Sequence, residues 1–146
     1  MNKTTETIST LTATTEVSIR FNEVDSLRVV WHGHYYKYFE DAREAFGKKY
    51  EIDYLTVFDQ GLLIPMVESS CNHKRPLKYG DTAIVEVTYH NLPAAKIHFT
   101  YKVYRKSDGK LSASGATTQV FLNVEGELLL NNPPFIDTWR QKWNLS

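Results

Sequence analysis

Several segments of the chain place apolar residues at every second position, the period of a β-strand with one buried face. In the 82–90 segment, for example, Ala83, Val85 and Val87 recur in this way. Proline cannot donate a ladder hydrogen bond, so Pro65 places the 62–74 segment at an edge or marks its start. The segments predicted as strands are 17–21, 62–74, 82–90, 95–104 and 112–124.

Residues 33–50 show a different period, close to that of an α-helix. Tyr35, Phe39, Ala42 and Phe46 follow one another at offsets of three or four residues and form one apolar stripe. The pattern predicts one long helix with this stripe against the core. The tyrosine and phenylalanine side chains of the stripe are expected to pack in the interior.

The order of elements predicts an α+β fold, because one helix follows the first strand and no helix separates the later ones. One antiparallel sheet of about five strands around a long central helix accounts for this order. Pro133 and Pro134 predict the start of a short C-terminal helix. Residues 1–14 are rich in threonine and poor in large apolar groups, so we expect a flexible tail there and a single domain over 15–146.

Composition narrows the classes of function. The 146 residues carry 17 basic and 17 acidic side chains, whereas nucleic-acid-binding proteins usually have a basic excess. We therefore expect no nucleic-acid partner. No apolar run approaches the length of a membrane span, and residues 1–16 lack the pattern of a signal peptide. The sequence thus predicts a cytoplasmic protein without a membrane partner.

Cysteine and metal chemistry are not expected. The single cysteine, Cys71, allows no intramolecular disulfide, and in an apolar run it is typical of a small buried residue rather than a nucleophile. His32 and His34 form a His-x-His pair, but no further ligands stand at the spacing of a known metal motif. We expect neither a metal ion nor another cofactor.

Asp25 and His32 combine a carboxylate and an imidazole with the start of the long helix. A carboxylate can act as general base or nucleophile, and unpaired N–H groups at a helix start suit a developing oxyanion. From spacing alone, however, Asp25 is more typical of a turn or a helix cap. His32 is equally consistent with a residue that caps backbone groups at the helix entry.

Residues 17–46 resemble the 4-hydroxybenzoyl-CoA thioesterase branch of the hotdog-fold superfamily. The segment carries an acid-x-Asp element ending at Asp25, a hydrophobic pair, an aromatic residue, His32, and Tyr-x-x-Tyr-Phe-Glu-x-Ala-Arg over 35–43. The similarity continues more loosely through Pro-x-x-x-Gly-Asp at 76–81 and the strand-like residues 115–121. The resemblance implies the hotdog fold.

The resemblance also implies roles for individual residues. Asp25 matches the catalytic carboxylate, acting either as general base toward water or as nucleophile on the thioester carbonyl. His32 lies in the active site of that branch, where it orients water or protonates the leaving thiolate. The backbone N–H groups near His32 and Gly33 polarise the carbonyl, and Gly33 lets the substrate approach closely.

Contacts with the substrate are harder to assign. Arg28 stands where relatives often carry glycine, so the loop is not expected to use a glycine conformation there; its side chain either binds an anionic group or is solvated. A basic cluster near Pro76 is either a solvated surface or a contact for the phosphates of CoA or of a carrier-protein arm. The candidate substrate contacts are Arg28, Trp31, Tyr36 and the basic cluster Lys74, Arg75 and Lys78.

The sequence therefore predicts an acyl thioesterase that hydrolyses acyl-CoA or acyl-carrier-protein thioesters to a carboxylic acid and a thiol. The resemblance implies a homodimer or homotetramer with sites at the subunit interface, and the edge strand at 62–74 is suited to join two sheets. Two alternatives stay open: a hotdog-fold hydratase or dehydratase, and a non-catalytic protein that binds an acyl ligand in the same cavity.

Overall fold

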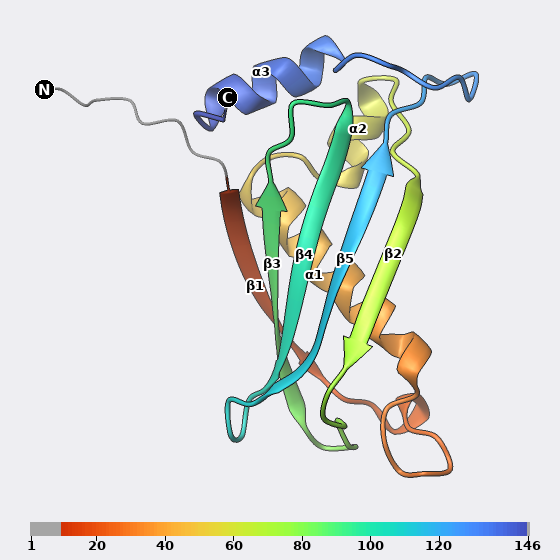
Figure 1. Ribbon diagram of the computed structural model, residues 1–146, viewed down its shortest axis with the longest axis vertical. Helices are drawn as coiled ribbons and strands as arrows, with labels where there is room; N and C mark the ends of the chain where they lie inside the picture. Colours follow the sequence, from red (N-terminus) through yellow and green to blue (C-terminus); the bar gives the residue numbers. More distant parts are fainter. Residues whose placement is uncertain (1–9, 146) are drawn as a thin grey trace, which may run out of the picture.

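The computed structural model describes residues 10–145. Five strands form one antiparallel sheet in the order β1-β3-β4-β5-β2 (Figure 1). β1 and β2 are therefore the two edge strands. The strands are β1 (Thr10–Ser18), β2 (Met66–His73), β3 (Thr82–His90), β4 (Lys96–Arg105) and β5 (Leu111–Val120).

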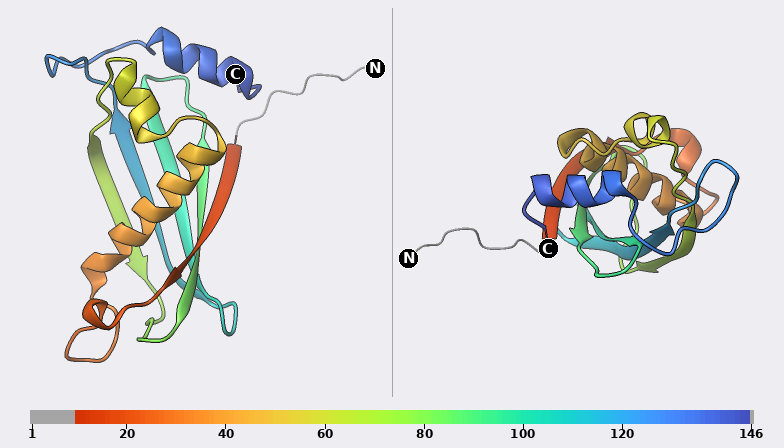
Figure 2. Two further views of the ribbon diagram at one scale, coloured as in Figure 1. Left: turned by 180° about the vertical axis from the view of Figure 1, so that it is seen from behind. Right: turned by 90° about the horizontal axis from the view of Figure 1, so that it is seen from above.

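The long helix α1 (Tyr35–Lys49) crosses the concave face of the curved sheet, and views from behind and from above show the sheet wrapped around it (Figure 2). The short helix α2 (Tyr54–Asp59) follows it, and α3 (Pro134–Lys142) lies across one end of the sheet. This is the α+β hotdog architecture predicted from the sequence. Two 3-10 turns, Phe21–Glu23 and His32–His34, precede α1.

The core lies between α1 and the inward-facing residues of the sheet. The predicted stripe on α1 is buried, and Phe39 stacks on Tyr101 of β4 with ring centroids 4.4 Å apart and planes at 10°. Phe46 meets Phe99 edge-on at 5.1 Å. Gly115 of β5 makes the close approach of Phe39 possible, because a Cβ there would lie 2.5 Å from the Phe39 ring. Aromatic packing thus fixes the helix against the sheet.

The predicted tail is wrong for residues 10–14. These residues form the first half of β1, which pairs with β3 from Thr10 opposite His90 to Ser18 opposite Thr82. Threonine is β-branched and favours strands, and Leu11 and Ala13 alternate with the threonines and are buried. Residues 1–9 of the predicted tail lie outside the described residues. The expected strand 17–21 is correspondingly displaced, ending at Ser18.

The other predicted strands and helices are confirmed with shifts of boundary, whereas α2 and the two 3-10 turns were not predicted. Pro65 immediately precedes β2, in agreement with its expected place at a strand start. β2 is the edge strand beyond β5, and almost all of its residues are exposed. Met66 and Val67, at an irregularity in the pairing of β2 with β5, are 38% and 54% exposed, so the start of β2 is uncovered.

Candidate active site

Asp25 lies in a short hairpin-like loop between β1 and α1, here called the Asp25 loop (residues 23–31). Val24 and Val30 form an antiparallel bridge, and the backbone N–H of Asp25 donates to Val29 O at 2.9 Å. One residue pair further along, Trp31 N–H donates to Glu23 O at 3.0 Å. The ladder puts Asp25 near the tip of the loop and His32 just beyond its base.

The Asp25 carboxylate is half-buried and held by its own loop. Its Oδ1 accepts the backbone N–H of Leu27 at 2.8 Å, the geometry of an Asx turn. The interpretation of Asp25 as a turn residue, made from spacing alone, therefore agrees with its conformation in this structure. Within residues 10–145, Oδ2 accepts no hydrogen bond, so this oxygen is available to a water molecule or a substrate.

Arg28 closes the turn with φ of +67°, in the left-handed region. The expectation that the loop would not use a glycine-like conformation here is wrong, since Arg28 adopts that conformation itself. Its backbone N–H donates to Asp25 O at 2.9 Å, which helps to hold the turn. A non-glycine residue in this region costs about 1–2 kcal/mol. The exposed guanidinium extends from a strained position next to Asp25.

Glu23, at the base of the loop, is structural. It is only 4% exposed, and its carboxylate accepts the backbone N–H of Arg20 at 2.7 Å and pairs with Lys37 at 3.4 Å. Burial and, next, the nearby Glu23 charge raise the pKa of Tyr38. Glu23 thus anchors the start of α1 to the Asp25 loop.

The turn His32–His34 leads into α1, and Tyr35 N–H donates to His32 O. The imidazole of His32 is exposed, and the Trp31 indole lies 4.9 Å from it and 5.4 Å from that of His34. The space that a Gly33 side chain would take is filled by the Trp31 indole. In this arrangement the glycine accommodates Trp31, and its role in letting the substrate approach stays a prediction.

The predicted aromatic contacts Trp31 and Tyr36 are both accessible at the start of α1. Trp31 is 47% exposed and Tyr36 36%, and the Tyr36 ring leans edge-on against Phe39 at 5.7 Å. Both rings lie on the same short stretch as His32, so the structure brings them to the helix entry. Exposed aromatic rings thus stand just before and just after the turn in the chain.

His73, the last residue of β2, joins this region although the sequence pattern gave no signal for it. Its Nε2 donates to the His32 carbonyl at 3.4 Å, and its ring stands edge-on to Tyr35 at 4.9 Å. The same nitrogen lies 3.5 Å from Cys71 Sγ.

Burial raises the pKa of the Cys71 thiol to about 11, so it is protonated at neutral pH. Cys71 is a packing residue, as the sequence indicated.

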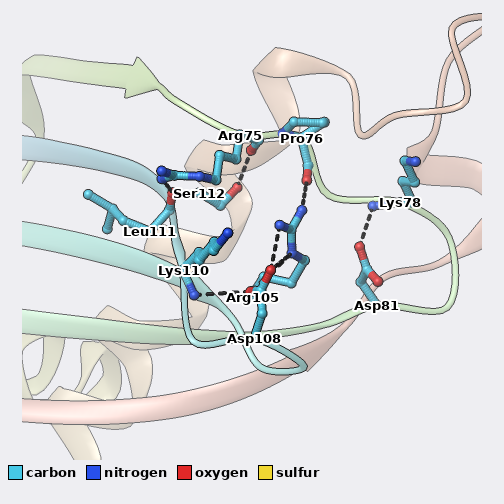
Figure 3. A network of polar contacts seen from close by, with 9 residues as sticks. All are labelled: Arg75, Pro76, Lys78, Asp81, Arg105, Asp108, Lys110, Leu111 and Ser112. Carbon is cyan, nitrogen blue, oxygen red and sulfur yellow. Dashed lines mark hydrogen bonds and ion pairs between the residues drawn. The ribbon is translucent and has the colours of Figure 1, made fainter.

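The basic cluster follows β2 and lies beside the Asp25 loop, because Val30 N–H donates to Leu77 O at 2.8 Å. Arg75 donates to Leu111 O at 2.9 Å, and the Lys78 backbone N–H donates to Asp81 at 2.8 Å (Figure 3). Within the described part of the chain, the ammonium groups of Lys74 and Lys78 form no ion pair. These two charges are free to meet an anion.

The hairpin between β4 and β5 braces this cluster. The Arg105 guanidinium donates three hydrogen bonds to Asp108, at 2.7 to 3.2 Å, and one to Pro76 O at 3.1 Å (Figure 3). Hydrogen bonds from Arg105 lower the pKa of Asp108 to about 2. Ser112 Oγ donates to Arg75 O at 2.6 Å. Arg105 is thus occupied within the protein, and the backbone that carries the basic cluster is held in place.

A cavity of about 650 Å³ lies at the other end of β2, between the second half of α1, α2 and the sheet. This volume is typical of small-molecule sites. None of the site residues predicted from the sequence lines it. The lining residues come from segments far apart in the chain, so the sequence alone does not show the cavity. Its walls are mainly apolar, with charged groups from α1, and include Glu40, Arg43, Phe46, Leu63, Phe99 and Trp139.

Two further findings concern the described residues only. No group of three or more histidine, cysteine, aspartate and glutamate side chains within 10–145 is arranged to hold a metal ion. Across the same residues, each helix is too short or too polar to traverse a lipid bilayer.

Comparisons with known proteins agree with this architecture. Residues 19–140 match the model of the thioesterase-like superfamily. A Bacillus subtilis protein provisionally named acyl-CoA thioesterase YneP is 28% identical over 110 residues, which cover 75% of this chain and 79% of the relative. An Aquifex aeolicus protein provisionally named an esterase is 31% identical over 111 residues, covering 76% and 84%.

The fold is also that of a solved structure. The DHNA-CoA thioesterase from Staphylococcus aureus superposes with a TM-score of 0.78 at 22% identity, covering 90% of this chain and 85% of the other. At this identity the match shows the fold, while the match of the family model spans most of the chain. The protein belongs to the thioesterase-like superfamily.

Proposed function

We propose that this protein hydrolyses acyl-CoA thioesters with Asp25 as the reacting carboxylate. The general activity, thioester hydrolysis, follows from membership of the family. The acyl-CoA substrate is supported by the name of the Bacillus subtilis relative, and an acyl-carrier-protein thioester is the alternative with the same reacting group. The observation that carries the role of Asp25 is its half-buried carboxylate, fixed at Oδ1 and open at Oδ2, in the loop that leads to the helix entry.

Two routes lead to the same products. As general base, Asp25 takes a proton from water while the water oxygen bonds to the thioester carbon; the C–S bond then breaks and the thiolate is protonated. As nucleophile, the carboxylate itself attacks the carbon, expels the thiolate and forms a mixed anhydride, which water hydrolyses. Both routes release a carboxylic acid and a thiol and regenerate the Asp25 carboxylate.

The turn His32–His34 supports the same reaction. Among the described residues, the backbone N–H groups of His32 and Gly33 donate to no carbonyl, and they stand at the positive end of the helix dipole. Such groups stabilise negative charge that develops on the carbonyl oxygen. The His32 imidazole is exposed at the same turn and is suited to protonate the departing thiolate.

β2 runs from the cavity to the turn after the Asp25 loop. Within one chain, the length of this strand therefore separates the Asp25 loop from the cavity. Ile64, just before β2, lines the cavity, whereas His73 at the end of β2 contacts the turn after the Asp25 loop (Figure 1). β2 is an exposed edge strand, so a second copy can pair with it. In an antiparallel pair about a two-fold axis, the start of one β2 lies beside the end of the other.

We therefore assign the complete site to a homodimer. The Asp25 loop of one copy meets the cavity of the second, and pairing of the two β2 strands covers the exposed Met66 and Val67. The acyl group lies in the cavity, and the basic cluster beside the loop binds phosphate groups of CoA. Lys74 and Lys78 supply the uncommitted charges for this contact. A tetramer would be two such dimers.

The reaction is tested by thiol release from a panel of short, long, hydroxylated and aromatic acyl-CoAs. We expect wild type to turn over at least one ester, and Asp25→Ala and Asp25→Asn to lose about a hundredfold or more in kcat, since acid–base groups contribute that much. Asp137→Asn, an exposed aspartate on α3, is the matched control and should keep full activity. Full activity in a folded Asp25→Asn protein would overturn the assignment.

A further inference from the structure

Arg43 is a permanently charged side chain on the wall of the cavity. It lies on α1, and its side chain is only 22% exposed, whereas that of Lys48 at the same cavity is 72% exposed. The nearby wall is built from large apolar groups such as Phe46, Phe99 and Trp139. A guanidinium keeps its charge at every physiological pH. The cavity therefore combines apolar walls with one largely buried cation.

This guanidinium has few partners inside the protein. Its ion pair with Glu40 is long, 3.8 Å between Nη2 and Oε2, and the Glu40 side chain is 66% exposed. Nη1 is buried and has no hydrogen-bond acceptor among the described residues. Buried polar groups are normally paired, and an unpaired donor on a charged group is costly. The unpaired Nη1 donor of Arg43 indicates that a ligand supplies an acceptor.

Tyr101 is a buried polar group whose hydroxyl the Arg43 guanidinium influences, and this hydroxyl also has a partner in the sheet. Burial raises the pKa of the Tyr101 hydroxyl, and the hydrogen bond with Thr117 and, after it, the Arg43 guanidinium oppose this rise. The hydroxyl lies 2.7 Å from Thr117 Oγ1, and both residues are buried. Arg43 thus acts on the buried Tyr101 hydroxyl and also borders the cavity.

We propose that Arg43 selects acyl groups that carry an acceptor oxygen, a carboxylate or a hydroxyl, on the part of the chain that enters the cavity. The proposal rests on the thioester hydrolysis proposed above and names its substrate class. The hydrocarbon part of such a group packs against the apolar wall, and its oxygen accepts from the guanidinium. A plain hydrocarbon chain would cover the same cation without a hydrogen bond, which disfavours its binding.

The test uses three straight-chain acyl-CoAs of equal length that end in a methyl, a hydroxyl or a carboxylate group. Wild type should prefer an oxygen-bearing ester by about ten- to a hundredfold in kcat/KM, the range expected for a hydrogen bond to a charged group. Arg43→Met should bring this preference close to one, mainly through KM. The hydroxyl and carboxylate arms distinguish the two kinds of acceptor.

Two further variants control for charge and for folding. Lys102→Met removes a positive charge from the outer face of β4 and should leave the preference unchanged. Arg43→Lys keeps the charge but loses the planar fork, so an intermediate preference is expected. If Arg43→Met does not fold, the comparison of wild type with Arg43→Lys decides the question.

A binding measurement separates this proposal from the proposed reaction. The free acids corresponding to the three esters are titrated against the protein, with tryptophan fluorescence as the signal because Trp139 lines the cavity. Arg43-dependent binding of the oxygen-bearing acids supports the proposal even if no ester is hydrolysed. Hydrolysis of all three esters at equal rates by wild type, unchanged in Arg43→Met, overturns it and leaves the thioesterase function intact.

Discussion

Replacing Gly115 with alanine tests how tightly α1 is seated on the sheet. An alanine Cβ would lie 2.5 Å from two ring carbons of Phe39 and from the Ser70 carbonyl oxygen. Phe39 has little freedom to retreat, because it is 1% exposed and stacked on Tyr101 at 4.4 Å. Gly115 has no positive φ, so the backbone itself accepts alanine and the cost comes from contacts alone.

The expected magnitude follows from these contacts. Overpacking a core typically costs about 1–3 kcal/mol, and loss of an aromatic stacking contact costs about 0.5–1.5 kcal/mol more. Gly115→Ala should therefore lower the free energy of unfolding by about 2–4 kcal/mol. With a urea m-value of about 2 kcal/mol/M, the midpoint of unfolding should fall by roughly 1–2 M.

Urea unfolding followed by far-UV circular dichroism measures this change. Ser114→Ala, one residue earlier and on the other face of β5, is the control and should shift the midpoint little. An unchanged midpoint in Gly115→Ala, at an unchanged m-value, would mean that Phe39 does not occupy the space above Gly115. The account of how α1 is seated would then be wrong.

Three other results are expected. Burial raises the pKa of the Cys71 thiol to about 11, so its alkylation at pH 8 should be about a hundredfold slower than that of an exposed cysteine. The rate of alkylation should continue to rise beyond pH 9, and a rate that reaches a plateau near pH 9 would contradict this. Arg28→Gly should keep kcat within about twofold, because glycine adopts positive φ freely. Arg28→Val should lower kcat about tenfold or more, because valine at positive φ strains the Asp25 loop. Equal kcat values in the two variants would show that the turn is not required. Val67→Asp should convert the proposed dimer into a monomer by light scattering and abolish turnover, because pairing of the two β2 strands would bury a carboxylate without a partner; an intact dimer would place the interface elsewhere.

Much of the fold could be predicted because its signals are local. The alternating strands and the stripe on α1 each bury one face, and the spacing of apolar residues shows that directly. The first half of β1 was missed because only Leu11 and Ala13 are buried there among threonines, so its structure depends on pairing with β3. α2 has six residues, too few for a periodic pattern to stand out.

The site could be predicted only where it lies on one segment. Asp25 and His32 are seven residues apart, so the sequence displays them together. His73 reaches the same turn from β2, 41 residues away from His32, and only the folded chain brings the two into contact. The conformation of Arg28 was missed because glycine is the usual residue at positive φ, and the loop's own hydrogen bonds impose it on arginine instead.

The central claim is that Asp25 of one copy acts on a thioester whose acyl group lies in the cavity of another. Two inactive variants test it when produced together: Asp25→Ala, which lacks the carboxylate, and Leu63→Trp, which fills the cavity. In a mixed dimer, one of the two sites has neither defect, so random mixing should restore about a quarter of wild-type thiol release. Activity no higher than that of the two parent variants, in a sample shown to contain mixed dimers, would contradict the account.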